Sequence, residues 1–184
     1  MRLWLAAAVF LGVAELAGAQ TFTLRGPTGV ETIDPGASSA TVVVFTSTRC
    51  PISDGYNSRL KELFASYSAK GVRFLVVNAN GNEPLAEVLA YRTSHTLPYP
   101  VYKDEDHTLA DRLGARVTPE AYLLKRDGTV AYQGAIDDSP NQARVKQHSL
   151  QEAIDAVLAG QPVPRAETKA FGCTIKRTGS STAR

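Results

Sequence analysis

The sequence predicts an α/β domain with a mixed central β-sheet, helices on both faces of the sheet and an N-terminal β-hairpin. Residues 41–45 (TVVVF) form a continuous β-branched run, which is typical of a strand buried on both faces. Residues 53–70 follow with apolar side chains at helical spacing, and Gly71 ends this helix. A second β-branched run covers residues 72–77. Strand, helix and strand in this order predict two parallel strands in the middle of the sheet.

Further elements are expected on both sides of this unit. Residues 21–33 alternate around the turn Pro27-Thr-Gly29 and predict the N-terminal hairpin. The last helix is expected to begin at Ser149, with Glu152 completing a capping box, and to end before Gly160. Between them the pattern predicts, in order, a helix over 84–93, a strand over 98–102, a helix over 108–113 ended by Gly114, and a hairpin of strands 121–125 and 129–134 around Asp127-Gly128.

Residues 1–19 have the pattern of a secretory signal peptide. Arg2 gives a positive start, an apolar run follows, and Ala17-Gly-Ala19 is a cleavage pattern. The apolar run is too short to span a bilayer comfortably. The alternatives to a cleaved signal peptide are an uncleaved membrane anchor and a buried N-terminal helix. We therefore expect a periplasmic or secreted protein with no stable membrane insertion after signal cleavage.

After cleavage about 165 residues would remain, which is enough for one domain with a substantial core. We expect this domain over residues 20–160, followed by an extended C-terminal tail over 161–184 that carries Cys173 and ends in a disordered polar segment. The net charge of +2 gives no reason to expect nucleic acid as a partner. Two cysteines are too few for a disulfide scaffold, which favours a chemical role for them.

Cys50 is the leading candidate for that role. It lies between the strand at 41–45 and Pro51, a residue suited to the first turn of a helix. A helix N-terminus and the neighbouring Arg49 both favour the thiolate over the thiol. The alternative is an inert buried cysteine at the end of a strand. Three nearby hydroxyls could hydrogen-bond the sulfur or its oxidised forms: those of Ser47, Thr48 and Ser53.

The order of the motifs resembles thioredoxin-fold proteins. The segment FTSTRCPIS around Cys50 takes the place of the thioredoxin W-C-x-x-C region, and Val117-Thr-Pro119 takes the place of the cis-proline loop. With the ending FGCTIK around Cys173, the chain is similar to exported bacterial redoxins of the peroxiredoxin-like group, the alkyl hydroperoxide reductase–thiol-specific antioxidant superfamily. The resemblance implies a thioredoxin fold in which Thr118 and Pro119 lie against the cysteine loop to receive substrate.

The chain departs from the active-site sequence patterns of both thioredoxins and peroxiredoxins. Ser53 stands where thioredoxins have a second cysteine, so a disulfide across the loop is impossible. Ser47 and Val43 stand where peroxiredoxins have a threonine and a proline before the reactive cysteine. The peroxide-holding arginine of peroxiredoxins has no clear counterpart near Thr118.

Cys173 is the remaining candidate for a second thiol. Residues 161–173 could span up to ~40 Å if extended, which is enough to bring Cys173 back to Cys50. Three interpretations stay open: a resolving cysteine that attacks oxidised Cys50, a permanent structural disulfide, and a free tail thiol.

We therefore expect thiol-disulfide or thiol-peroxide redox chemistry, including antioxidant activity, with Cys50 as nucleophile. Its partners would be a thiol or disulfide protein or a peroxide, with an external thiol as electron donor. No metal, flavin or nucleotide signature is present, so no cofactor is expected. Two alternatives remain: a redox-inactive module that binds peptides or a partner, and a copper metallochaperone, although His95, His107 and His148 lack metal-ligand spacing.

Overall fold

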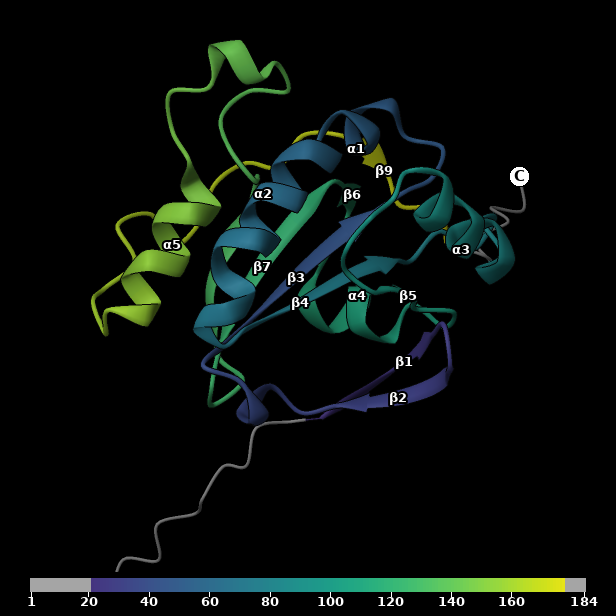
Figure 1. Ribbon diagram of the computed structural model, residues 1–184, viewed down its shortest axis with the longest axis horizontal. Helices are drawn as coiled ribbons and strands as arrows, with labels where there is room; N and C mark the ends of the chain where they lie inside the picture. Colours follow the sequence, from purple (N-terminus) through teal and green to yellow (C-terminus); the bar gives the residue numbers. More distant parts are fainter. Residues whose placement is uncertain (1–20, 178–184) are drawn as a thin grey trace, which may run out of the picture.

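The computed structural model describes residues 21–177, so the expected signal peptide and the polar segment 178–184 lie outside the described range. A mixed seven-stranded sheet forms the centre, with strand order β2-β1-β5-β4-β3-β7-β8 (Figure 1). Its strands are β1 (Phe22–Gly26), β2 (Gly29–Ile33), β3 (Ala40–Thr46), β4 (Val72–Asn78), β5 (Val101–Lys103), β7 (Glu120–Lys125) and β8 (Val130–Gly134). A second, two-stranded sheet pairs β6 (Val117–Thr118) with β9 (Cys173–Thr174).

Helices cover both faces of the central sheet, which confirms the predicted fold class. The helices α2, α3 and α5 contribute to one core cluster, whereas α4 and the β1–β2 hairpin contribute to the other. The helices are α1 (Pro51–Gly55), α2 (Asn57–Tyr67), α3 (Leu85–Ser94), α4 (Thr108–Leu113) and α5 (Ser149–Leu158), with 3-10 turns at Pro35–Ala37, Ser68–Lys70 and Gln142–Arg144.

Strand β3 lies at the centre and leads directly into the Cys50 loop. It pairs in parallel with β4 and antiparallel with β7. Because side chains alternate along a strand, Val42 and Val44 pack with α2, while Val43 and Phe45 pack on the opposite face. All four side chains are fully buried, as the sequence predicts for this run. The position of Cys50 is therefore set by the most deeply buried strand of the sheet.

Three predicted boundaries are wrong. The strand expected at 98–102 begins only at Val101, because Pro98 and Pro100 have no N–H to give to a ladder. The long helix expected over 53–70 is interrupted at Tyr56, which separates α1 from α2. The last helix has His148 rather than Ser149 at its N-cap, so the expected capping box is absent.

The C-terminal tail returns along the domain after α5, and the sequence pattern did not predict its strand β9. It first follows the edge strand β8, where the Gln133 amide donates to the carbonyl of Ala166 (2.9 Å). The Thr168 amide then donates to the carbonyl of Gln133 (3.0 Å). The tail then pairs with β6 through β9, beside the start of α1 (Figure 1). A segment of little regular structure thus joins the far end of α5 to the Cys50 loop.

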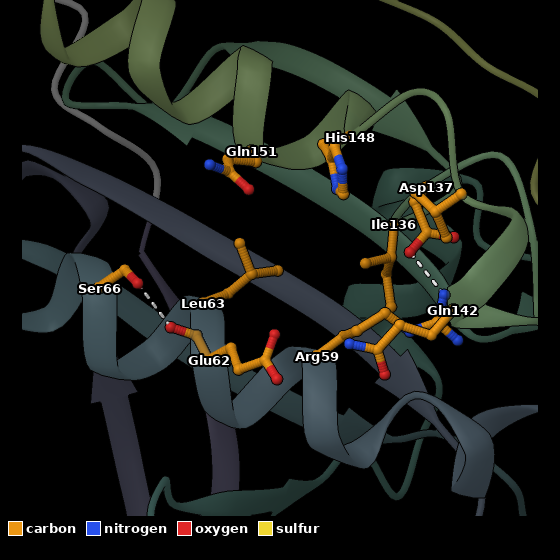
Figure 2. Close-up of a pocket in the computed structure, with 10 residues that line it drawn as sticks. Arg59, Glu62, Leu63, Ser66, Ile136, Asp137, Gln142, His148 and Gln151 are labelled. Carbon is orange, nitrogen blue, oxygen red and sulfur yellow. Dashed lines mark hydrogen bonds and ion pairs between the residues drawn. The ribbon is translucent and has the colours of Figure 1, made fainter.

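A buried ion pair fixes the loop between β8 and α5. Arg59 of α2 donates to Asp137 (2.6 Å), and the Tyr56 hydroxyl donates to the same carboxylate (2.8 Å). The Arg59 guanidinium also donates to the carbonyls of Ser139 and Pro140. Beside this pair lies a pocket of about 180 Å³ between α2, α5 and the loop (Figure 2). Its lining contains none of the described residues around Cys50, so the pocket is separate from the cysteine loop.

We predict that Arg59→Leu lowers the free energy of unfolding by about 3 kcal/mol, because it leaves the Asp137 carboxylate buried without its counter-ion. The matched control is Arg165→Leu, which breaks an exposed ion pair with Glu152 (2.6 Å) and should cost about 0.5 kcal/mol. Urea unfolding of both variants gives the comparison. Equal losses in the two variants would contradict the anchoring role of Arg59.

Candidate active site

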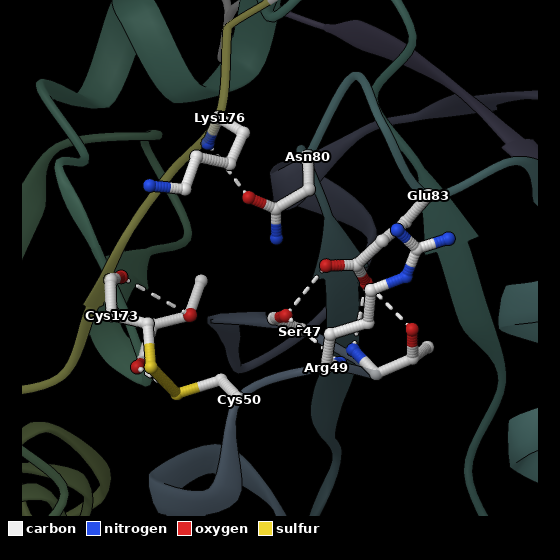
Figure 3. The surroundings of a disulfide bond; sticks show 9 residues. Ser47, Arg49, Cys50, Asn80, Glu83, Cys173 and Lys176 are labelled. Carbon is white, nitrogen blue, oxygen red and sulfur yellow. Dashed lines mark hydrogen bonds between the residues drawn. A yellow bond between two sulfur atoms is a disulfide. The ribbon is translucent and has the colours of Figure 1, made fainter.

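Cys50 and Cys173 form a disulfide bond, with their Cα atoms 6.0 Å apart and 123 residues between them in the sequence (Figure 3). Cys50 is 1% exposed, whereas Cys173 is only half-buried. Cys50 is also the N-cap of α1, where its carbonyl accepts from the Asp54 amide (3.0 Å). The pairing contradicts the interpretation of Cys173 as a free tail thiol and leaves the resolving cysteine and the structural disulfide.

The disulfide lies against the Thr118–Pro119 loop, whose peptide bond is cis. The antiparallel pairing of β6 with β9 places Thr118 opposite Cys173. The Cys50 Sγ lies 3.2 Å from the carbonyl oxygen of Thr118, and the Thr118 hydroxyl donates to the carbonyl of Cys173 (3.3 Å). A reduced Cys50 could donate its S–H to this carbonyl, an interaction that favours the thiol over the thiolate. The structure thus brings together Cys50, Cys173, Thr118 and Pro119.

Gly172 allows the tail to approach this loop so closely. A Cβ added at Gly172 would overlap the carbonyl group of Thr118, so a larger residue would push β9 away from β6. On either side of the cysteine, Phe171 packs its ring against Tyr56 (6.3 Å between centroids) and Ile175 is buried in the core. The sequence pointed to Phe171, Gly172 and Ile175 only as part of the FGCTIK ending and gave them no role, although a glycine before a cysteine is the kind of signal that indicates close backbone approach.

Glu83 holds the loop that precedes Cys50. Its buried carboxylate accepts hydrogen bonds from the Ser47 hydroxyl (2.6 Å), the Thr48 amide (2.7 Å) and the Thr48 hydroxyl (2.8 Å). The Asn78 side-chain amide donates to it as well (2.6 Å). Buried carboxylates are stable only when hydrogen-bonded in this way, so Glu83 fixes the loop conformation. The sequence gives no signal for this role, because Glu83 is an isolated acidic residue in a turn.

Among the described residues, no hydrogen bond joins Thr48, Arg49 or Ser53 to a sulfur atom of the disulfide. The Arg49 guanidinium donates to Glu87 (2.9 and 2.6 Å) and extends away from the disulfide (Figure 3). The hydrogen bonds from Arg49, and then those from Thr48, hold the pKa of Glu87 at about 2. The Ser53 hydroxyl is buried and has no hydrogen-bond partner among the described residues. Thr48 and Arg49 therefore form hydrogen bonds with the carboxylates of Glu83 and Glu87, and not with the disulfide.

A buried polar network links this loop to the tail. The Lys103 ammonium donates to the Asn78 side chain (2.8 Å) and to the carbonyl of Asn80. Burial lowers the pKa of Lys103. On the tail side, the Asn80 side-chain oxygen accepts from the Lys176 amide (2.7 Å). The loop before Cys50 and the segment after Cys173 are thus attached to one set of hydrogen-bonded side chains.

The sequence profile of the AhpC/TSA family matches residues 19–133, and the tail with Cys173 lies beyond the matched residues. No curated protein matches the chain. The crystal structure of a hypothetical protein from Sinorhizobium meliloti 1021 is similar, with 30% identity, a TM-score of 0.79 and coverage of 88% of this chain and 93% of that one. An uncharacterised conserved protein from Geobacillus kaustophilus has 30% identity, a TM-score of 0.80 and coverage of 89% and 92%.

A third structure supports the fold alone. It is that of a candidate thiol:disulfide interchange protein, DsbE, from Chlorobium tepidum, with 22% identity and a TM-score of 0.64. The match covers 77% of this chain and 95% of that one. The predicted thioredoxin fold is therefore confirmed.

We predict that Gly172→Ala makes the disulfide easier to reduce, because the added Cβ overlaps the Thr118 carbonyl and the tail of this variant can move away from the overlap only when the disulfide no longer holds Cys173. The equilibrium constant for disulfide formation against dithiothreitol should fall about tenfold or more, since steric overlap in a packed site costs about 1–3 kcal/mol. Gly55→Ala is the matched control, because a Cβ there meets nothing within 4 Å. Alkylation of the released thiols at equilibrium gives the measurement. A similar constant for both variants would show that the close approach is unimportant.

We predict that Glu83→Gln destabilises the protein by about 2 kcal/mol, because one amide oxygen cannot replace a carboxylate that accepts several buried hydrogen bonds. Glu87→Gln should cost about 0.5 kcal/mol, since Glu87 is partly exposed and its ion pair with Arg49 is at the surface. Denaturant unfolding monitored by circular dichroism compares the two variants. A larger loss for Glu87→Gln would overturn the assignment of Glu83 as the anchor of the loop.

Proposed function

The chain belongs to the AhpC/TSA family, and from this premise we propose that it is an exported thiol oxidoreductase whose two cysteines alternate between dithiol and disulfide. The observation that carries the proposal is the Cys50–Cys173 disulfide against the Thr118–Pro119 loop at the start of α1. A thiol at a strand-to-helix junction, with a second thiol held in contact with it, has what reversible disulfide chemistry requires.

In the proposed reaction the Cys50 thiolate is the nucleophile. It attacks an oxygen of a hydroperoxide, the O–O bond breaks, and the products are a Cys50 sulfenic acid and an alkoxide that takes up a proton. With a disulfide substrate, the same thiolate forms a mixed disulfide and releases one thiolate. Cys173 then attacks the Cys50 sulfur, which forms the internal disulfide and releases water or the second thiolate. Two external thiols, or one dithiol, donate the two electrons that restore both cysteines and are themselves released as a disulfide.

The neighbouring residues have separate roles in this proposal. Thr118 and Pro119 form the wall against which both sulfurs lie, and the Thr118 carbonyl accepts the S–H of reduced Cys50. Thr48 and Arg49 stabilise the loop through Glu83 and Glu87. The Ser53 hydroxyl, which has no hydrogen-bond partner among the described residues, would hydrogen-bond an oxidised Cys50 in this proposal. Cys50 and Cys173 are the catalytic residues in the strict sense.

Export belongs to the same proposal. Residues 1–19 would be the signal peptide, residues 20–160 the redoxin domain, and residues 161–184 the tail that brings Cys173 back. A disulfide persists most readily in an oxidising compartment, which supports a periplasmic or secreted location. Within residues 21–177 no helix has the length and apolar character needed to cross a membrane. The partners would be a peroxide or a disulfide as oxidant and an external thiol as reductant.

We predict that the reduced protein is oxidised to the internal disulfide by hydrogen peroxide or a small disulfide much faster than free cysteine is. Cys50→Ser should abolish this fast oxidation, because the nucleophile is lost. Cys173→Ser should stop the reaction at a Cys50 sulfenic acid or mixed disulfide, because the resolving thiol is lost. Mass spectrometry of samples quenched with an alkylating agent distinguishes these species, and wild-type protein is the control.

Two other sets of results from these experiments would indicate a different function. Cysteines that react no faster than free cysteine, with a bond that mild reductants leave closed, would indicate a redox-inactive binding module held by a structural disulfide. Stoichiometric Cu(I) binding by the reduced protein that is lost in Cys50→Ser, with no fast oxidation, would indicate a metallochaperone.

A further inference from the structure

We propose that the C-terminal tail stays docked when the disulfide is reduced, and that the docked tail restricts Cys50 to small oxidants and excludes extended polypeptides. The inference rests on the proposed redox function of Cys50 and Cys173 and names the substrate class of that site. It follows from how the tail is held on both sides of Cys173.

Downstream of Cys173, the tail is anchored in the core and by hydrogen bonds. Ile175 is 3% exposed and packs in the core cluster on the α4 face of the sheet. Its amide donates to the carbonyl of Arg116 (2.9 Å). Lys176 is held at both backbone groups, because its amide donates to Asn80 and its carbonyl accepts from the Gly81 amide (both 2.7 Å). These contacts are made within three residues of Cys173, and none of them involves a sulfur atom.

Upstream of Cys173, Thr168 provides a second anchor. Its hydroxyl forms hydrogen bonds with the Tyr132 hydroxyl (2.6 Å) and the Ala135 amide (3.0 Å), and its own amide donates to Gln133 (3.0 Å). Phe171 then packs against the ring of Tyr56. The cysteine therefore lies between two fixed points, and breaking the S–S bond removes neither of them.

The docked tail occupies the place that an extended substrate would need. Strand β9 takes the free edge of β6, and Gly172 lies directly on the Thr118–Pro119 peptide group. An extended peptide that binds by strand addition requires that same edge. A small oxidant needs only the space opened when the half-buried Cys173 side chain turns away from the buried Cys50. The docked tail thus admits or excludes oxidants according to their size, while the reaction at Cys50 stays the same.

The first test measures docking directly in the reduced state. Amide hydrogen exchange is recorded for reduced wild-type protein and for the double variant Cys50→Ser/Cys173→Ser, with oxidised protein as reference. We expect the amides of Ile175, Lys176 and Gly81 to keep protection within about tenfold of the oxidised protein. Exchange of these amides at the rate of an unstructured chain, in a protein whose sheet remains protected, would overturn the proposal.

The second test measures size discrimination with a pair of neighbouring substitutions. Ile175→Ala removes the buried anchor, and Thr174→Ala changes the neighbouring exposed residue at the end of β9. Reduced proteins are oxidised either by hydrogen peroxide or by an extended peptide that carries a disulfide to a second peptide. The rate with the peptide should rise about tenfold or more in Ile175→Ala, because truncation of this buried side chain favours undocking of the tail, and should change less than about twofold in Thr174→Ala.

The rate with hydrogen peroxide should be similar in all three proteins, because it does not depend on undocking. Equal rates of peptide oxidation for wild type and Ile175→Ala would overturn the proposal. The docking measurement uses no turnover, so a docked tail with no oxidation of Cys50 would defeat only the proposed function. Conversely, fast oxidation together with an exchanging tail would defeat only the size restriction.

Discussion

The bond between Cys50 and Cys173 joins the loop after the central strand to the C-terminal tail, and the arrangement around it depends on both partners being held independently. β3 fixes Cys50 through its pairing with β4 and β7, while Thr168 and Ile175 fix the tail on either side of Cys173. A crosslink over 123 residues nominally stabilises the fold by about 4–5 kcal/mol, through the loss of unfolded-state entropy. Two independently held sulfurs also form a pre-organised pair, which favours fast closure of the bond.

The electrostatic surroundings indicate how this pair would work. Arg49 is engaged by Glu87, and the carbonyl of Thr118 beside Cys50 favours the thiol. The Cys50 side chain makes no capping hydrogen bond at the start of α1 in the disulfide form, so the thiolate must gain its stabilisation from the backbone there on reduction. Proximity of Cys173 then speeds the closing step, whereas the first attack on the oxidant depends on the Cys50 thiolate itself. The buried network from Glu83 to Asn80 supports that proximity, because it attaches the cysteine loop and the tail to the same side chains.

The sequence predicted those parts of the fold that have a local pattern. The apolar run of β3 and the Asp127-Gly128 turn identify their elements without tertiary information. The two-residue strands β6 and β9 have no periodicity to detect, and their pairing is long-range. The sequence identified Cys50 by its position before Pro51 and left the partner of Cys173 open, because an extended tail can reach many places. Glu83 was missed because its role depends on hydrogen bonds that only the folded chain assembles.

The central claim is that Cys50 and Cys173 form a reversible redox pair within the folded protein. Equilibration of the native protein with graded ratios of reduced to oxidised dithiothreitol, followed by alkylation and circular dichroism, tests it most directly. The account predicts that both thiols appear together at a defined ratio, with the circular dichroism unchanged, and that the bond re-forms when the ratio is reversed. A bond that opens only when the protein unfolds would contradict the account and would identify the disulfide as a permanent structural link.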